Sequence, residues 1–136
     1  MANRDFKDVQ ALEREVKIVG GRISFAGTSS PSHTKTPTVA EGIGYTVAAN
    51  AADNDGIFTI TLGTSSQTDK YSDLLYCHAH VVGTSERYVE LSAHSVGAGT
   101  LSFIMKDKDD DNATADVAFN GLEVQFIAFL KNSSVT

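Results

Sequence analysis

The sequence lacks several features that mark well-defined protein classes. It has a single cysteine, Cys77, so no disulfide can form within the chain. No apolar run approaches the roughly 18 residues that span a bilayer, and the residues after Met1 lack the apolar core of a signal peptide. We therefore expect a protein that is made in the cytoplasm, has no membrane contact, and is held together by packing.

Positive charge is also scarce. The chain has 11 basic and 17 acidic residues, which give a net charge of -6 and a pI of about 5.0. Nucleic-acid binding needs clustered Lys and Arg, and here they are scattered, so we expect no nucleic-acid partner. The 136 residues are 41% hydrophobic, which is enough for the core of one domain over residues 1–136.

The first fifteen residues predict a short helix. Asn3 is a suitable N-cap, and acidic residues follow it where the helix dipole favours negative charge. Phe6, Val9 and Leu12 recur at steps of three and form one apolar stripe. A helix this short needs a surface to dock on, either on its own domain or on a neighbouring subunit. We treat residues 1–15 as a helical arm.

From Val16 onward the apolar pattern changes to a period of two, which is typical of strands. We expect a mostly β fold: an antiparallel β-sandwich or jelly roll of about seven or eight strands with the short N-terminal helix. Its body is 16–131 and its polar tail 132–136, and residues 26–41, rich in Ser, Thr, Pro and Gly, are expected to be a loop. The expected strands cover residues 16–25, 42–49, 57–62, 74–82, 87–96, 100–105 and 122–130.

Alternation also predicts which side chains face the core. Phe58, Ile60 and Leu62 are expected to point inward. In the strand around residues 74–82, one face is expected to carry Leu75, Cys77, Ala79 and Val81, and the other Tyr76, His78, His80 and Val82. The last strand is apolar on both faces, so it is either central in a sheet or covered by a partner subunit.

The histidines are the weak candidates for a metal site. His78 and His80 stand at i and i+2 and would share one strand face, and His94 on the following strand could lie opposite and supply a third ligand. The alternative is that they are polar residues on a solvent or interface face. No carboxylate or cysteine stands at a recognisable ligand spacing, so we expect no bound metal.

No motif indicates catalysis. The chain has no phosphate-binding loop, nucleophile elbow or zinc-protease motif. The acidic run that begins at Asp107 opens like a calcium-binding loop, but Asn112 stands where that loop needs Gly and Ala118 where it needs Glu. We therefore expect neither an enzyme nor a cofactor.

Five segments follow one another in a recognisable order: Val16-Lys17-Ile18-Val19-Gly20-Gly21, the run 56–62 before Asp69-Lys70-Tyr71, the strand 74–82, residues 96–104, and the ending 129–135. In this order the chain resembles, over roughly residues 15–135, the head decoration, or cement, proteins of tailed bacteriophages. The resemblance implies a jelly roll or β-sandwich on the capsid surface of the virion. It also implies that the protein bridges neighbouring capsomers and stabilises the shell, with the major capsid protein and its own copies, as dimer or trimer, for partners.

The residues offer candidate interfaces for such a role. The candidates are Phe6, Val9 and Leu12 in the arm, and Phe129 and Leu130 in the last strand, each of which could equally be core. Two other functions stay open. One is a tail- or fibre-associated β-sandwich that binds host glycans. The other is a metal-dependent enzyme of the cupin type, built on the three histidines.

Overall fold

The structure, a computed structural model, describes residues 16–26, 36–49, 56–64, 67–68, 71–83, 87–107 and 121–132. This part of the chain forms two antiparallel sheets, and the expectation of a mostly β fold is confirmed for it. The arm of residues 1–15, the tail beyond residue 132 and most of the acidic loop lie outside the described residues. No helix in the described ranges is long and apolar enough to cross a membrane.

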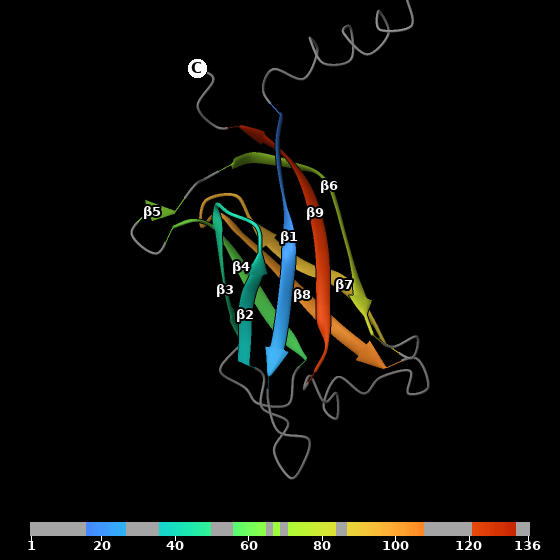
Figure 1. Ribbon diagram of the computed structural model, residues 1–136. Helices are drawn as coiled ribbons and strands as arrows, with labels where there is room; N and C mark the ends of the chain where they lie inside the picture. The colour runs from blue at the N-terminus through green and yellow to red at the C-terminus, as the bar shows by residue number, and fades with distance from the viewer. Residues whose placement is uncertain are drawn as a thin grey trace, which may run out of the picture.

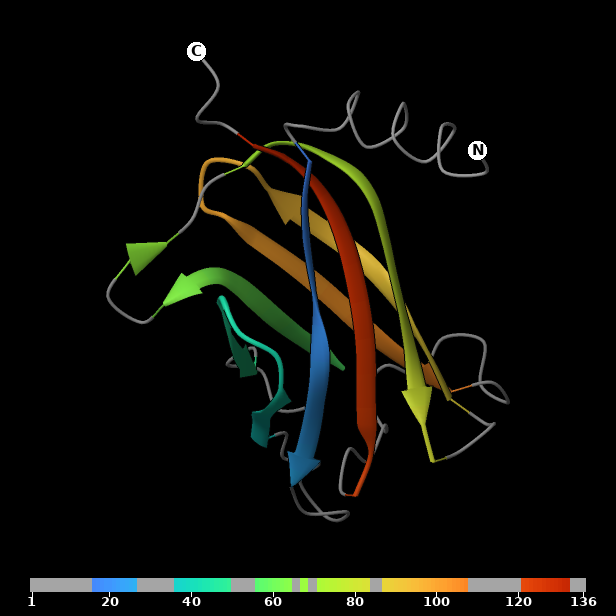
Figure 2. The same cartoon turned by 45° about the horizontal axis from the view of Figure 1, so that its top comes forward.

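Each sheet has four main strands. The first sheet has the order β2-β1-β9-β6, formed by Thr36–Glu41, Val16–Ala26, Glu123–Asn132 and Tyr71–Val82. The second has the order β3-β4-β8-β7, formed by Tyr45–Ala49, Ile57–Thr64, Thr100–Asp107 and Arg87–Ser95. The two-residue strand β5 (Gln67–Thr68) pairs with the end of β4. Figures 1 and 2 show the two layers, with the strands of the second sheet running obliquely behind those of the first.

The chain repeatedly passes from one sheet to the other. It crosses between β2 and β3, between β4 and β6, between β6 and β7, and between β8 and β9. The last crossing places β9 between β1 and β6, so the final strand is central in its sheet. Its inner face joins the core through Val124, Phe126, Ala128 and Leu130, whereas its outer face carries the exposed Ile127 and the half-buried Phe129.

The core lies between the sheets and is rich in phenylalanine. The rings of Phe58 and Phe103 stack with centroids 5.5 Å apart inside the second sheet. Phe25 meets Phe58 edge to face at 5.0 Å, and Phe126 lies 6.2 Å from Phe103, so both contacts join the two sheets. The predicted inward residues of β4 are confirmed, since they are fully buried: Phe58, Ile60 and Leu62.

The prediction of a loop over residues 26–41 is wrong at its end, because Thr36–Glu41 forms the edge strand β2. Pro37 is tolerated there because an edge strand leaves one row of backbone groups unpaired. Pro37 and Val39 are half-buried and alternate with exposed residues, so the two-residue period was present in the sequence. The Ser- and Thr-rich composition concealed it.

The predicted inner face of β6 is wrong at Leu75. The pairing of β6 with β9 shifts register between Leu74 and Tyr76, and this irregularity turns Leu75 outward, where half of its side chain is exposed. Leu74 packs against the core instead. Beyond the shift the predicted alternation holds, because Cys77 and Val81 pack against the core and Ala79 is buried in it, whereas His78 and His80 are exposed.

The glycine pair in β1 serves a close contact. Gly20 and Gly21 pair with β9 without interruption, and the register shift of β1 falls after them, against β2 between Arg22 and Ile23. A Cβ atom on Gly21 would lie 2.5 Å from the carbonyl oxygen of Glu41 and closer still to the hydroxyl of Tyr45. Gly21 therefore makes room for the buried Tyr45, whose ring also meets Phe126 edge to face at 5.0 Å.

Candidate interaction surface

The outward face of the first sheet carries rows of side chains from three strands. One row consists of Ile18 on β1, Phe129 on β9 and Tyr76 on β6. The next row along the strands has Gly20, Ile127 and His78, and the one after it has Arg22, Gln125 and His80. The row where β1 begins and β9 ends has Val16, Lys131 and Asp73, so the apolar rows lie between a charged row at this end and polar, charged side chains toward the other.

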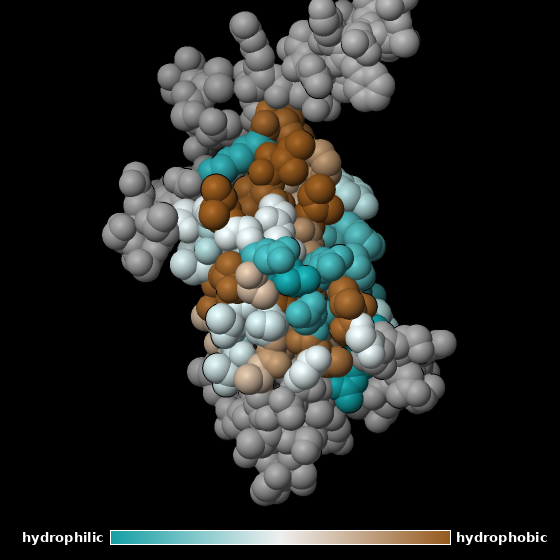
Figure 3. All heavy atoms as spheres, viewed as in Figure 1, coloured by the Kyte–Doolittle hydropathy of each residue, from teal (hydrophilic) through white to brown (hydrophobic). Residues whose placement is uncertain are grey.

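We call the apolar part of this face the apolar patch. It comprises Val16, Ile18, Leu75, Tyr76, Ile127 and Phe129. Seven large hydrophobic side chains in the described part of the chain are exposed, and four of them lie in this patch: Ile18, Leu75, Tyr76 and Ile127. Figure 3 looks onto this face and shows brown side chains gathered over the upper ends of the strands, above a mainly teal region. A patch in which exposed apolar side chains touch one another is typical of an interaction surface.

The patch is hollowed. Val16, Leu75, Tyr76 and Phe129 line a shallow depression of about 320 Å³. The rings of Tyr76 and Phe129 lie 5.9 Å apart at 62°, so they hold each other in place along one wall. The lining contains no Asp or Asn, and the Tyr76 hydroxyl is its one polar side-chain group. This composition favours an apolar side chain as the occupant.

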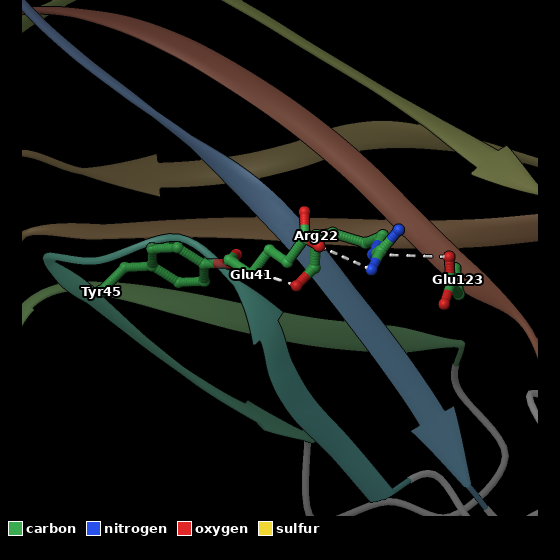
Figure 4. A network of polar contacts seen from close by, with 4 residues as sticks. All are labelled: Arg22, Glu41, Tyr45 and Glu123. Atoms are coloured by element: carbon green, nitrogen blue, oxygen red, sulfur yellow. Dashed lines mark hydrogen bonds and ion pairs between the residues drawn. The ribbon is translucent and has the colours of Figure 1, made fainter.

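The polar end of the face is organised by Arg22. Nη2 of Arg22 donates to Oε1 of Glu41 at 2.9 Å, and its Nε lies 3.7 Å from Oε2 of Glu123 (Figure 4). Beneath this guanidinium the Tyr45 hydroxyl donates to the carbonyl of Glu41 at 2.6 Å. The ion pairs join β2, β1 and β9 across the outside of the sheet.

These ion pairs contribute little stability because their side chains are at least one-third exposed. Such surface pairs typically contribute about 0–1 kcal/mol. Their effect is on specificity, since a partner that covers this end must match one positive and two negative groups. By contrast, contact of a partner with the apolar patch releases water from apolar surface, which favours binding.

The structure separates the predicted interface residues Phe129 and Leu130. Phe129 lies in the apolar patch, whereas Leu130 is 1% exposed and belongs to the core. Of the two possibilities left open for Leu130, partner contact or core, its burial supports the core, because adjacent residues of a strand point to opposite faces of the sheet. Phe6, Val9 and Leu12 lie outside the described residues. The sequence analysis missed Ile18, Leu75 and Tyr76. Outward alternation beside apolar neighbours was the available signal for Ile18 and Tyr76, whereas the outward orientation of Leu75 follows from the register shift in β6.

The three histidines do not converge. His78 and His80 lie side by side on the outward face with ring centroids 6.0 Å apart, next to a shallow depression of about 220 Å³. His94 is on β7, which belongs to the other sheet and pairs with β8, so it does not lie opposite them as predicted. In the described ranges no three His, Cys, Asp or Glu side chains form a group that could hold a metal ion.

His94 has a structural contact instead. The buried Tyr71 donates its hydroxyl proton to the carbonyl of Thr100 at 3.1 Å, and the same oxygen lies 3.1 Å from Nδ1 of His94. Because the hydroxyl has one proton, Nδ1 of His94 is the donor in that second contact. The rings stack with centroids 6.2 Å apart. Tyr71 thus joins the first sheet to β7 and β8 of the second.

Burial also changes the acidity of three side chains. It raises the pKa of the Cys77 thiol from 9.0 to about 11. Burial raises the pKa of Tyr45 as well, against a smaller opposing effect of its hydrogen bond to the backbone of Arg22. Burial, followed by the charges of Cys77 and Asp73, raises the pKa of Tyr71. Cys77 is thus a partly buried small hydrophobe, with a thiol that stays protonated at neutral pH.

These shifts predict a loss of stability at alkaline pH. Between pH 9 and 11 the unfolded chain releases protons that the folded protein keeps, so the free energy of unfolding falls as the pH rises through this interval. We expect urea-unfolding midpoints to be level between pH 7 and 8 and to decline above pH 9. The Cys77→Ala variant should decline less steeply. A midpoint that holds steady or rises up to pH 11 would contradict this prediction.

Comparison with known proteins gives no relative: no protein-family model, no curated protein and no solved structure matches this chain.

Proposed function

We propose that this chain is a structural virion protein that binds the outer surface of a phage capsid and stabilises it by bridging neighbouring capsomers. Its partners are then the major capsid protein and further copies of itself, and it is not an enzyme. The capsid is proposed as the partner because of the resemblance to phage decoration proteins. The residues of the outward face of the first sheet favour a role in assembly over a role in catalysis.

One observation carries the proposal: an apolar patch and an ion-paired region lie side by side on the outward face of a sheet whose inner face closes a solid core. An apolar centre with polar, charged neighbours is the usual composition of a protein interface. Because the face is built on three adjacent strands, its side chains are held at fixed spacings. A cement protein needs a rigid docking face of this kind and no catalytic groups.

We further propose that the two sheets form a β-sandwich of the jelly-roll type. The core between the sheets and the four crossings from one sheet to the other support this classification. Alternating crossings place strands that are distant in sequence side by side, as β1 and β9 are here.

The two alternative functions have less support. A glycan site needs aromatic rings with Asp or Asn beside them, and the depression next to Tyr76 and Phe129 has no Asp or Asn in its lining. A cupin-type metal site needs histidines that converge inside the fold. His78 and His80 are instead exposed on the outside of the first sheet, and His94 bonds to Tyr71.

The decisive experiment adds the purified protein to capsids from which it has been stripped. We expect saturable binding in a fixed ratio to the major capsid protein and a higher melting temperature of the capsid by calorimetry. Many docked copies act together on one shell, so modest single contacts can produce a measurable stabilisation. If neither binding nor a shift in melting temperature is seen, the capsid role is wrong.

Two tyrosines provide a matched comparison for the docking face. Tyr76 is 54% exposed in the apolar patch, and Tyr88 is 41% exposed on β7 of the other sheet. We expect Tyr76→Ala to weaken capsid binding at least tenfold and Tyr88→Ala to leave it within twofold. Equal effects of the two variants would show that the partner does not meet the outward face of the first sheet.

A further inference from the structure

The size of the apolar patch limits what can occupy it. Its six side chains are only partly exposed, so together they present roughly 400 Å² of apolar surface. A stable complex between separate proteins buries about 800 Å² on each partner. The patch alone is therefore too small to hold a second copy of the chain firmly, but it suits a short segment that presents a few apolar side chains.

Such a segment is attached to the patch. Val16, which lines the depression, is directly preceded by residues 1–15. Four residues span at most roughly 14 Å, so Leu12 cannot lie farther than that from Val16, whatever path the chain takes. This short connection keeps the segment near the patch at an effective concentration on the order of millimolar. Contacts that are too weak to bind a free partner are therefore sufficient to hold the attached segment on the patch.

The spacing of the apolar side chains also matches. If residues 6–12 are helical, as their sequence predicts, the stripe of Phe6, Val9 and Leu12 extends about 9 Å. The three strands β1, β9 and β6 that carry the patch span about 10 Å from the first to the third. One large apolar side chain of the stripe fits the depression between Leu75 and Phe129.

We propose that residues 1–15 lie on the apolar patch of their own molecule, with Phe6, Val9 and Leu12 against the sheet. The segment thereby becomes part of the outward face on which a partner docks. The inference rests on the proposed function only in treating this face as the assembly surface. It can be tested without capsids, so its failure is distinguishable from failure of capsid binding.

The test is a disulfide between segment and patch in the full chain. In a Cys77→Ala background, Val9→Cys is combined with Tyr76→Cys, and the protein is oxidised mildly at low micromolar concentration. We expect a monomer with an internal disulfide, seen as a reductant-sensitive mobility shift. The matched control combines Val9→Cys with Tyr88→Cys, whose position is on the other sheet, and should react at least tenfold more slowly.

Two results would overturn the proposal. Disulfide-linked dimers as the main product would mean that the segment lies on a second copy, and equal rates in test and control would mean that it is not seated on the patch at all.

A second measurement needs no engineered cysteine. Val9→Asp places a negative charge in the stripe, whereas Gln10→Asp adds the same charge beside it. We expect Val9→Asp to raise the fluorescence of a dye that binds exposed apolar surface about threefold or more, and Gln10→Asp to leave it unchanged. An unchanged signal with both variants would also overturn the proposal.

Discussion

Gly21→Ala is expected to lower the free energy of unfolding by about 3 kcal/mol, at the upper end of the usual cost of overpacking. An added Cβ atom would meet the Glu41 carbonyl oxygen at 2.5 Å and Cε1 of Tyr45 at 2.8 Å. The first of these is a backbone atom, so a side-chain rotation cannot relieve the contact. Either β2 moves away from β1 or Tyr45 leaves its position in the core.

Urea unfolding followed by circular dichroism measures this effect, and the chain provides a matched control. A Cβ atom on Gly97 would have no heavy atom within 4 Å, so Gly97→Ala should change the free energy of unfolding by less than about 0.5 kcal/mol. Loss of backbone freedom in the unfolded chain is the same for both substitutions, so their difference isolates the contact. A Gly21→Ala protein as stable as Gly97→Ala would show that Tyr45 does not pack against β1.

The second large effect compares two neighbours in β9. Leu130→Ala should cost about 3–4 kcal/mol, since Leu130 is fully buried and its loss leaves a cavity between the sheets. Phe129→Ala should cost about 1–2 kcal/mol, although it removes a larger side chain, because the half-buried Phe129 lies on the outward face and its loss leaves no enclosed cavity. Denaturation curves of the two variants give both values.

The same two variants distinguish an effect on folding stability from an effect on binding. Phe129→Ala removes a wall of the depression, so it should weaken the attachment of residues 1–15 and the docking of a partner while the fold persists. If Phe129→Ala were the more destabilising of the two, β9 would face the other way, and the apolar patch would not exist as described.

Much of the fold could be predicted from residue order. Alternation located most of the strands, since residues such as Phe58 and Ile60 recur with the two-residue period that a half-buried strand requires. It also placed Cys77 against the core and the neighbouring histidines outside. The edge strand β2 was missed because an edge strand buries less and tolerates Pro37, so its pattern is weak.

Much less of the candidate site could be predicted from the sequence. The prediction that His94 lies opposite His78 and His80 assumed that consecutive strands pair, but β6 and β7 belong to different sheets. Leu75 was assigned to the core because a register irregularity has no reliable sequence signal. Phe129 and Leu130 were both candidate interface residues, because the sequence of a strand that is apolar on both faces does not show which face is buried.

The sequence by itself determined the strands and turns, since the apolar period and the turn residues depend on neighbouring residues alone. Its lack of basic clusters also determined that a nucleic-acid partner is not expected. Only the tertiary structure decided which strands are neighbours. Pairing Ile18 with Phe129, and Phe129 with Tyr76, brings three parts of the chain into one apolar row. The physical reason is that such pairing follows from how the whole core closes between the sheets. A surface made of distant segments is therefore set by the packing of the entire domain.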